Sequence, residues 1–372
     1  MSFDLHAVVR TEVRAQTPYQ TGPESRPGLR VKLDANESPF ALGEILRGAL
    51  AAELARALGD VELQRYPDPT AREVRTLLAG DLGVEAEQIL ITNGSDEAIQ
   101  LLQMVVAGPA ASLAIPVPTF AMYAIGARAM GIRVAEVPLA EDFSLDAARF
   151  LDRLRRERPR LVFLAWPNNP TGNLFDPHAV EAILAACAGR DCHSLVVVDE
   201  AYGHYSGRSF LPRLGEFPNL VILRTLSKIG LAGIRLGILI ANAEVVREVN
   251  KVRLPYNVNA LSQAAARVVL AHGDVVAQHA AVIVNERERV LAALGAMPGV
   301  RVYPSQANFV LLRTPRRGDA VYADLLARGI AVRNFSRAPQ LADCLRVTIG
   351  AAAENDAFLR ALAAVLGPGG DT

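Results

Sequence analysis

Six short runs of apolar residues recur through the middle of the chain, most of them separated by enough residues to form a helix. They are QILIT (88–92), SLAIP (112–116), LVFLAW (161–166), SLVVVD (194–199), LVILRT (220–225) and LGILIA (236–241). Strands that are apolar on both faces are typical of a parallel sheet covered by helices on either side. The sequence therefore predicts an α/β fold whose large domain has a mostly parallel central sheet flanked by helices.

The C-terminal part of the chain has a different pattern. A charged amphipathic stretch at 285–293 is followed by ANFVLLR (307–313), the helix-like AVYADLLARG (320–329) and CLRVTIG (344–350). This mixture indicates a smaller α+β domain. Because 372 residues exceed the usual size of one domain, we expect an N-terminal arm and helix at 1–48 that pack with the small domain, a large domain at 49–262 and a small domain at 263–372.

Charge and cysteine content narrow the classes of partner and compartment. Lysine plus arginine equals aspartate plus glutamate at 39 each, so no broad basic surface for nucleic acid or anionic lipid is expected. Three cysteines are too few for a disulfide framework and favour a reducing cytoplasm. Cys192 and His193 resemble part of a zinc site, but no second ligand pair has zinc spacing, so no metal is predicted.

Two segments bear on export and membrane insertion. The first residues, MSFDLHAVVRTEVR, lack the continuous apolar core of a signal peptide. The uncharged run at 98–127 is long enough to cross a bilayer, but Gly108, Pro109, Pro116 and Pro118 divide it. We interpret this run as a buried helix, a turn and a buried strand of a cytoplasmic protein.

Polar residues stand at the ends of four predicted strands. Asn93-Gly94-Ser95 follows the first run, Asn168 follows the third, Asp199 ends the fourth and Ser227-Lys228 follows the fifth. Ligands of open α/β sheets bind beyond the carboxyl ends of the strands. These residues are therefore predicted to share one edge of the sheet and to form a site there.

Lys228 is the candidate nucleophile of this site. A desolvated lysine loses its proton more readily and can attack an aldehyde as a free amine. Seven residues later, Arg235 can hold a phosphate in bidentate fashion, and Ser227 can add a hydroxyl to the same anion. The alternative for Lys228 is an ordinary solvated loop lysine.

Two other strand ends suggest binding of an anion and of a cation. Gly94, Ser95 and Asp96 precede an apolar helical run and form a helix N-terminus that can bind an anion, or an ordinary capped helix. Asp199 ends an apolar strand, where a buried carboxylate is costly without a cationic partner. A protonated pyridine ring would supply that cation, and the aspartate would keep the ring an electron acceptor.

The motifs PNNPTG (167–172), DEAY (199–202), SK (227–228) and GIR (233–235), in this order, resemble the aspartate-aminotransferase-like (fold type I) pyridoxal-phosphate family. The histidinol-phosphate aminotransferase branch of that family is the most similar, through TPYQ (17–20), LDANESPF (33–40), RYPD (65–68) and VPTFAMY (117–123). The resemblance implies pyridoxal 5'-phosphate as cofactor and a homodimer whose active sites lie at the interface.

The resemblance also implies a role for each matched residue at the cofactor. Lys228 would form the Schiff base and carry the proton, and Asp199 would pair with the ring nitrogen. Asn168 and Tyr202 would contact the phenolic oxygen, with Phe120 stacked on the ring, although Phe120 could equally be a core residue. The phosphate would be held by Gly94, Ser95, Asp96, Ser227 and Arg235, joined by Tyr66 of the second subunit.

For the substrate, the resemblance implies Arg346 as the main anion contact, with Arg333, Tyr19 and Asn36 nearby; a structural salt bridge is the alternative for Arg346. The implied reaction is reversible amino transfer between L-histidinol phosphate and 2-oxoglutarate, giving imidazole-acetol phosphate and L-glutamate. An aromatic amino-acid aminotransferase and a threonine-phosphate-type decarboxylase share most of these residues. A ligand-sensing module without turnover would carry an added basic segment, which this sequence does not show.

Overall fold

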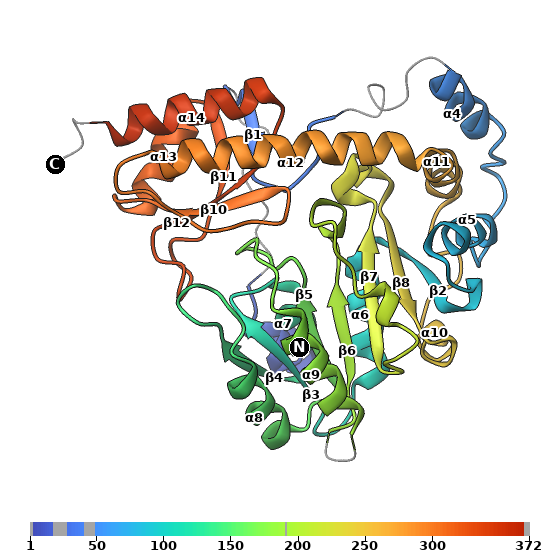
Figure 1. Cartoon of the computed structure of the whole chain (residues 1–372). Helices are drawn as coiled ribbons and strands as arrows, with labels where there is room; N and C mark the ends of the chain where they lie inside the picture. Colours follow the sequence, from blue (N-terminus) through green and yellow to red (C-terminus); the bar gives the residue numbers. More distant parts are fainter. Residues whose placement is uncertain (1–2, 18–27, 41–48, 190–191, 368–372) are drawn as a thin grey trace.

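The computed structural model describes residues 3–17, 28–40, 49–189 and 192–367, and these residues build two sheets (Figure 1). The larger sheet has seven strands in the order β2-β8-β7-β6-β5-β3-β4. Its strands are β2 (Ile89–Asn93), β3 (Ser112–Val117), β4 (Arg133–Pro138), β5 (Leu161–Ala165), β6 (Leu195–Asp199), β7 (Leu220–Thr225) and β8 (Leu236–Ala241). The predicted α/β fold class is confirmed.

Strand β8 is the one antiparallel member of this sheet. It pairs antiparallel with both β2 and β7, while the other neighbouring strands run parallel. Strand β2 therefore points the same way as β5, β6 and β7, so all four carboxyl ends lie at one edge. The start of β8 lies at that same edge, because β8 runs in the opposite direction.

Helices cover both faces of the larger sheet, as its apolar strands require. Alternate residues of β6 face opposite sides: Val196 and Val198 belong to one buried cluster and Val197 to the other. The first cluster is completed by α5 (Arg72–Leu82), α8 (Ala147–Glu157), α9 (Pro177–Ala188) and α11 (Ala260–Leu270). The second is completed by α6 (Gly94–Val106), α7 (Met122–Ala129) and α10 (Ala243–Asn250).

Several of these helices begin at side chains that accept hydrogen bonds from the first turn. Asp146 caps α8, Asp176 caps α9 with a proline at the next position, and Asn259 caps α11. An N-cap oxygen satisfies a backbone N–H that has no partner within the helix. These caps fix where each helix leaves the sheet edge.

The smaller sheet has five strands in the order β1-β11-β12-β10-β9. They are β1 (Val31–Leu33), β9 (Arg301–Val302), β10 (Phe309–Arg313), β11 (Ile330–Asn334) and β12 (Cys344–Thr348). Helices α13 (Gly318–Ala327) and α14 (Ala352–Leu366) pack with this sheet around a separate buried cluster. Strand β1 brings the N-terminal arm into this sheet by pairing parallel with β11.

Helix α12 (Gly273–Gly295) joins the two parts of the chain (Figure 1). Its first half packs through Val276 into the core of the larger sheet, and its second half packs through Ile283 and Val290 into that of the smaller one. The proposed domain boundary at 262/263 lies inside α11, which precedes α12. Division into 49–262 and 263–372 remains our proposal.

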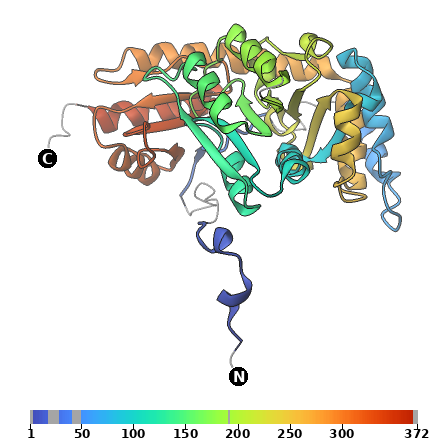
Figure 2. The ribbon, with the colours of Figure 1, turned by 90° about the horizontal axis from the view of Figure 1, so that it is seen from below.

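The N-terminal segment leaves the main body of the molecule (Figure 2). It contains α1 (Leu5–Val8) and α2 (Thr11–Arg14), and Arg10 donates a hydrogen bond to the carbonyl of Ala129 at the end of α7. Helix α4 (Ala49–Gly59) packs against α11 at the other side of the molecule. Short 3-10 turns, including η2 (Gly203–Tyr205), η4 (Ser227–Ile229) and η5 (Ala232–Ile234), line the edge where the predicted site lies.

The uncharged run at 98–127 forms most of α6, a turn and then β3, as the sequence indicated. Among the residues that the structure describes, no single helix is long and apolar enough to cross a membrane. The bent pair α11 and α12, at 80° to each other, meets the criteria of length and composition together. Both helices contribute side chains to the buried clusters of the fold.

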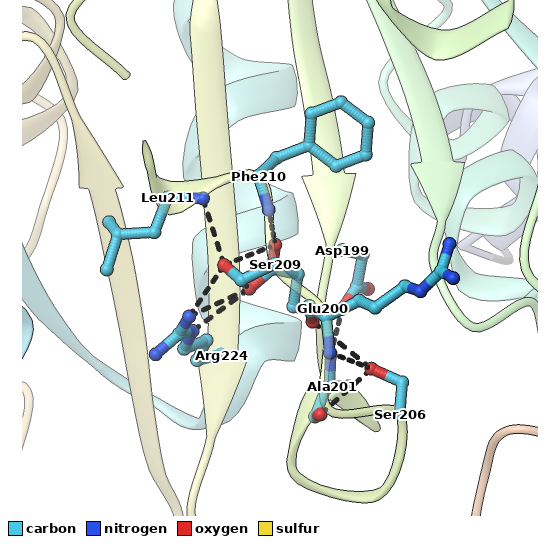
Figure 3. A network of polar contacts seen from close by, with 10 residues as sticks. Asp199, Glu200, Ala201, Ser206, Ser209, Phe210, Leu211 and Arg224 are labelled. Carbon is cyan, nitrogen blue, oxygen red and sulfur yellow. Dashed lines mark hydrogen bonds and ion pairs between the residues drawn. The ribbon is translucent and has the colours of Figure 1, made fainter. Parts of the chain in front are cut away.

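A buried ion pair fixes the ends of β6 and β7 (Figure 3). The carboxylate of Glu200 is fully buried and accepts hydrogen bonds from Arg224 Nε at 3.1 Å and Nη2 at 3.0 Å. The Ser209 hydroxyl and the Phe210 N–H donate to the same carboxylate at 2.8 and 2.6 Å. Burial raises the pKa of Glu200, while Arg224 opposes that rise. This network holds the loop after Asp199 against β7, which leads to Lys228.

Replacing Arg224 by alanine should lower the free energy of unfolding by about 3 kcal/mol, because it leaves a buried carboxylate without its cation. Chemical denaturation of the Arg224→Ala variant measures this loss. Arg128→Ala is the matched control, since Arg128 pairs with Glu136 at the surface, and such pairs contribute about 0–1 kcal/mol. Equal losses in the two variants would contradict the role given to the buried pair.

Candidate active site

The carboxyl ends of the central strands enclose a cavity of about 110 Å³. The loops after β2, β3, β5, β6 and β7 all contribute to its lining, together with the residue that precedes β8. The lining residues are Ser95, Asp96, Phe120, Tyr123, Ala165, Pro167, Asn169, Asp199, Ala201, Tyr202, Thr225, Ser227, Lys228 and Arg235. Eight residues predicted from the sequence are thus brought together: Ser95, Asp96, Phe120, Asp199, Tyr202, Ser227, Lys228 and Arg235.

One end of the cavity has the features of an anion site. Arg235 Nη2 contacts Asp96 Oδ2 at 2.9 Å, which holds the guanidinium beside the first turn of α6. Gly94 starts that helix with φ 74°, and a Cβ at this position would lie 2.6 Å from Arg235 Nη2. Gly237 packs equally closely, since its Cβ would lie 2.3 Å from the carbonyl carbon of Gly94. Two glycines therefore let the guanidinium approach a helix N-terminus, where anions bind.

Asp199 also lines the cavity and is 5% exposed. Its Oδ2 accepts a hydrogen bond from the Tyr123 hydroxyl at 2.6 Å, and its Oδ1 accepts one from the Ala201 N–H at 3.0 Å. Burial raises the pKa of Asp199 to about 6, although both hydrogen bonds oppose the rise. A cation placed in the cavity would offset this desolvation.

Lys228 enters the cavity from η4, directly after β7. Its Nζ donates to the Ala35 carbonyl at 3.3 Å and lies 6.0 Å from the centre of the Tyr202 ring. The hydroxyl of Tyr205 donates to the Lys228 carbonyl and fixes the backbone of this turn. A primary amine is thus held in the lining of the same cavity as Arg235 and Asp199.

The N-terminal arm closes one side of the site through Asn36. Its side-chain amide donates to the Tyr202 hydroxyl at 2.9 Å, and its oxygen accepts from the Thr348 hydroxyl at 3.2 Å. The Asn308 amide donates to the Asn36 carbonyl at 3.1 Å. Burial raises the pKa of Tyr202, and Arg346 and the Asn36 hydrogen bond oppose that rise. Asn36 therefore joins the arm, the larger sheet and the smaller sheet.

Arg346 projects from β12 toward the loop after β5. Its Nη1 donates to Asn169 Oδ1 at 2.5 Å and its Nη2 to the Asp34 carbonyl at 2.8 Å. The guanidinium lies 5.2 and 5.5 Å from the ring centres of Phe309 and Phe335. Arg346 as a whole residue is 6% exposed and is not among the residues that line the cavity.

The structure places Asn168 outside the cavity lining. The Asn168 side chain donates to the Pro118 carbonyl and to Thr171, and accepts from Thr119, so its polar atoms are used by its own loop and by the loop after β3. Asn169 lines the cavity instead. Ala165, Pro167 and Asn169 line the cavity at alternate positions, so the residue that faces the cavity is one position later than the predicted Asn168.

Tyr66 and Arg333 are likewise not among the residues that line the cavity. Tyr66 is 80% exposed and stacks on Tyr256 with ring centres 4.4 Å apart. Arg333 is the register partner of Arg346 on β11 and does not line the cavity. Tyr19 falls outside the described residues.

Tyr123 is the main lining residue that the sequence reasoning missed. It follows Phe120 in VPTFAMY by three positions, and in a helix such a spacing places two side chains on the same face. This spacing was the available signal. Asn169 and Thr225 were also missed, although each neighbours a residue that the motifs singled out.

The family described as aminotransferase class I and II matches residues 30–365. The chain belongs to this family. A histidinol-phosphate aminotransferase 1 from Ralstonia nicotianae is 46% identical to this aminotransferase over 97% of the chain and 95% of the relative.

Solved structures agree with this assignment. A histidinol-phosphate aminotransferase from Sinorhizobium meliloti, in complex with pyridoxal-5'-phosphate, superimposes on this aminotransferase with a TM-score of 0.84, 26% identity and 98% coverage of both chains. An L-threonine-O-3-phosphate decarboxylase from Porphyromonas gingivalis gives a TM-score of 0.77 at 25% identity, covering 91% of this chain and 99% of that one. The fold is therefore shared by enzymes with different activities.

The raised pKa of Asp199 predicts how the stability of the cofactor-free aminotransferase depends on pH. The unfolded chain ionises Asp199 near 3.8, whereas the folded chain keeps the proton up to about 6. Stability therefore falls as pH rises between these values. Asp199→Asn should raise the free energy of unfolding at pH 7 by about 3 kcal/mol, with little difference at pH 4. Denaturation at both pH values tests this; an equal change at each would contradict it.

Proposed function

We propose that this aminotransferase uses pyridoxal 5'-phosphate to transfer an amino group reversibly between L-histidinol phosphate and 2-oxoglutarate, giving imidazole-acetol phosphate and L-glutamate in histidine biosynthesis. The observation that carries the proposal is one cavity that holds a lysine amine, a buried carboxylate and an anion site. Relatives named for this reaction, at 43–46% identity over most of their length, support the choice of substrate.

The residues present fit the cofactor. Arg235, Ser95 and Ser227, with the N-terminus of α6 that begins at Gly94, would hold its phosphate, and Asp96 would orient the guanidinium. Asp199 would pair with the protonated ring nitrogen, whose positive charge would offset the desolvation of that buried carboxylate. Tyr202, with Asn169 in place of Asn168, would contact the phenolic oxygen, and Phe120 would lie against the ring. When bound, the ring supplies an acceptor for the electrons released at the substrate Cα.

Lys228 is the group that we assign to covalent attachment and proton transfer. Lys228 is the lysine among the residues that line the cavity. As a free amine, Lys228 would take the proton from the substrate Cα, hold it and later return it. The carbonyl of Ala35 and the ring of Tyr202 keep this amine near the cavity.

Arg346 is the proposed contact for the acidic group of each substrate. A planar guanidinium binds phosphate and carboxylate in the same bidentate way, so one residue can serve histidinol phosphate and glutamate in turn. The phenyl rings beside it and the Asp34 carbonyl hold the side chain in place. Asn36 and Arg333 would stand nearby, and Tyr19 keeps its proposed place at the substrate.

The proposed assembly is a homodimer with shared active sites. Leu63, Tyr66, Leu254 and Tyr256 expose 71, 80, 73 and 41% of their surface, and Tyr66 stacks on Tyr256. This apolar surface lies apart from the cavity of its own chain, which supports a place for Tyr66 at the cofactor phosphate of a second subunit. Small molecules are the proposed ligands of a cytoplasmic enzyme, with neither nucleic acid nor membrane as partner.

A spectroscopic half-reaction tests the activity. Purified protein loaded with pyridoxal 5'-phosphate should lose the absorbance of the aldehyde form of the cofactor on mixing with L-histidinol phosphate. The same loss should be much slower with L-phenylalanine. Lys228→Ala should abolish turnover with an intact fold, because the amine is needed for chemistry more than for packing. Lys251→Ala is the matched control, since Lys251 is a surface lysine paired with Glu248.

Other results of this experiment would change the assignment. An equal or faster reaction with L-phenylalanine would indicate an aromatic amino-acid aminotransferase. Release of carbon dioxide from a phosphorylated amino acid would indicate a decarboxylase. The structural similarity to the L-threonine-O-3-phosphate decarboxylase is the reason for this test. Full multiple-turnover activity of the Lys228→Ala variant would contradict the role of Lys228 in covalent attachment and proton transfer.

Subunit complementation tests the shared site. Tyr66→Ala and Lys228→Ala should each be nearly inactive alone. Unfolding and refolding the two variants together should restore up to about one quarter of wild-type activity, because mixed dimers contain one site with both residues intact. Activity is measured against each variant refolded alone. Failure of the mixture to gain activity, with dimers present by sedimentation, would contradict a role for Tyr66 across the interface.

A further inference from the structure

Tyr123 is held rigidly beside the cavity by contacts on several sides. Its side chain is fully buried, and its ring stacks on Phe163 with centres 4.5 Å apart and 6° between the planes. The ring also packs edge to face against that of Phe120, with ring centres 5.5 Å apart. The buried Gln103 amide donates to the Tyr123 carbonyl at 2.8 Å and fixes the start of α7. The position of the hydroxyl is therefore determined before any ligand binds.

The Tyr123 hydroxyl makes a short hydrogen bond to Asp199 Oδ2, at 2.6 Å. Together with the Ala201 N–H on Oδ1, it fixes the plane of the carboxylate. Asp96 on α6 and Glu200, next in the chain, are the acidic groups that raise the pKa of Asp199 further. Burial raises the pKa of Tyr123 well above its usual value, so the hydroxyl keeps its proton and remains a donor.

We propose that Tyr123 is a positioning residue that acts through Asp199, keeping this carboxylate ionised and aimed at the nitrogen of the cofactor ring. This proposal rests on the proposed function, because it concerns the same site. One proton can reside either on Asp199 or on the ring nitrogen. A hydrogen-bond donor that stabilises the Asp199 carboxylate favours the state in which the proton is on the ring nitrogen. The ring then stays the stronger electron acceptor.

The test is the pH titration of the cofactor absorbance in the holoenzyme. A positive charge on the ring favours loss of the proton from the linkage to Lys228 and so lowers the midpoint of this titration. Tyr123→Phe keeps the stacking on Phe163 but removes the hydrogen bond to Asp199. We expect the midpoint to rise by roughly one pH unit, since a hydrogen bond to a charged group is worth about a tenfold change or more in such an equilibrium.

Two controls separate this role from a structural one. Tyr303→Phe also removes a buried tyrosine hydroxyl, which has no hydrogen-bond partner among the described residues, and should leave the midpoint unchanged. In an Asp199→Asn background, Tyr123→Phe should add no further shift, because the two residues act as one unit. A fluorinated tyrosine at position 123 is a stronger donor with nearly the same shape and should move the midpoint the opposite way.

The outcomes distinguish the two proposals. Wild-type protein that shows no cofactor band contradicts the proposed function itself. A normal wild-type band with an unchanged midpoint in both Tyr123→Phe and the fluorinated protein overturns the role of Tyr123 alone. An additional shift of the same size in the Asp199→Asn background also overturns it, since the effect would then not pass through Asp199. The role of Tyr123 is supported if the midpoint shifts in opposite directions in Tyr123→Phe and in the fluorinated protein, and if both shifts disappear in the Asp199→Asn background.

Discussion

Two adjacent carboxylates stand at the end of β6, and both must be compensated inside the protein. Glu200 meets Arg224, Ser209 and the Phe210 N–H, so its charge is balanced within the fold. Asp199 receives only neutral donors, and no Lys or Arg among the described residues forms an ion pair with it. The first carboxylate thus holds the loop in place, while the second leaves a site for a cation that a ligand can supply.

The direction of β8 gives the site its second charged end. A wholly parallel sheet would have placed the start of this strand at the far edge, away from Asp199. Because β8 runs antiparallel between β2 and β7, Arg235 arrives beside the first turn of α6, where Gly94 and Gly237 leave room for the guanidinium. The cavity lining therefore contains a carboxylate, a guanidinium and the amine of Lys228.

The sequence predicted the large-domain fold well, since its apolar runs fall within one residue of β2, β3, β5, β6, β7 and β8. It missed β4, whose alternating and partly exposed residues have no continuous apolar run. At the site, strand ends were predictable but side-chain direction was not, which explains the exchange of Asn168 for Asn169. Tyr123 was missed because its role depends on a contact with Asp199, 76 residues away in the chain.

The contacts of Arg346 connect substrate recognition to the cofactor side of the cavity. Its guanidinium already contacts Asn169, and Asn36 links Tyr202 to Thr348 on the same strand β12. The smaller sheet is therefore joined to the cavity through two amide side chains rather than through apolar packing alone. An incoming anion would compete with Asn169 for Arg346, so its binding would release an amide that faces the cavity. Under the proposed function, binding of an anion at Arg346 would therefore change the hydrogen bonding of Asn169 in the cavity.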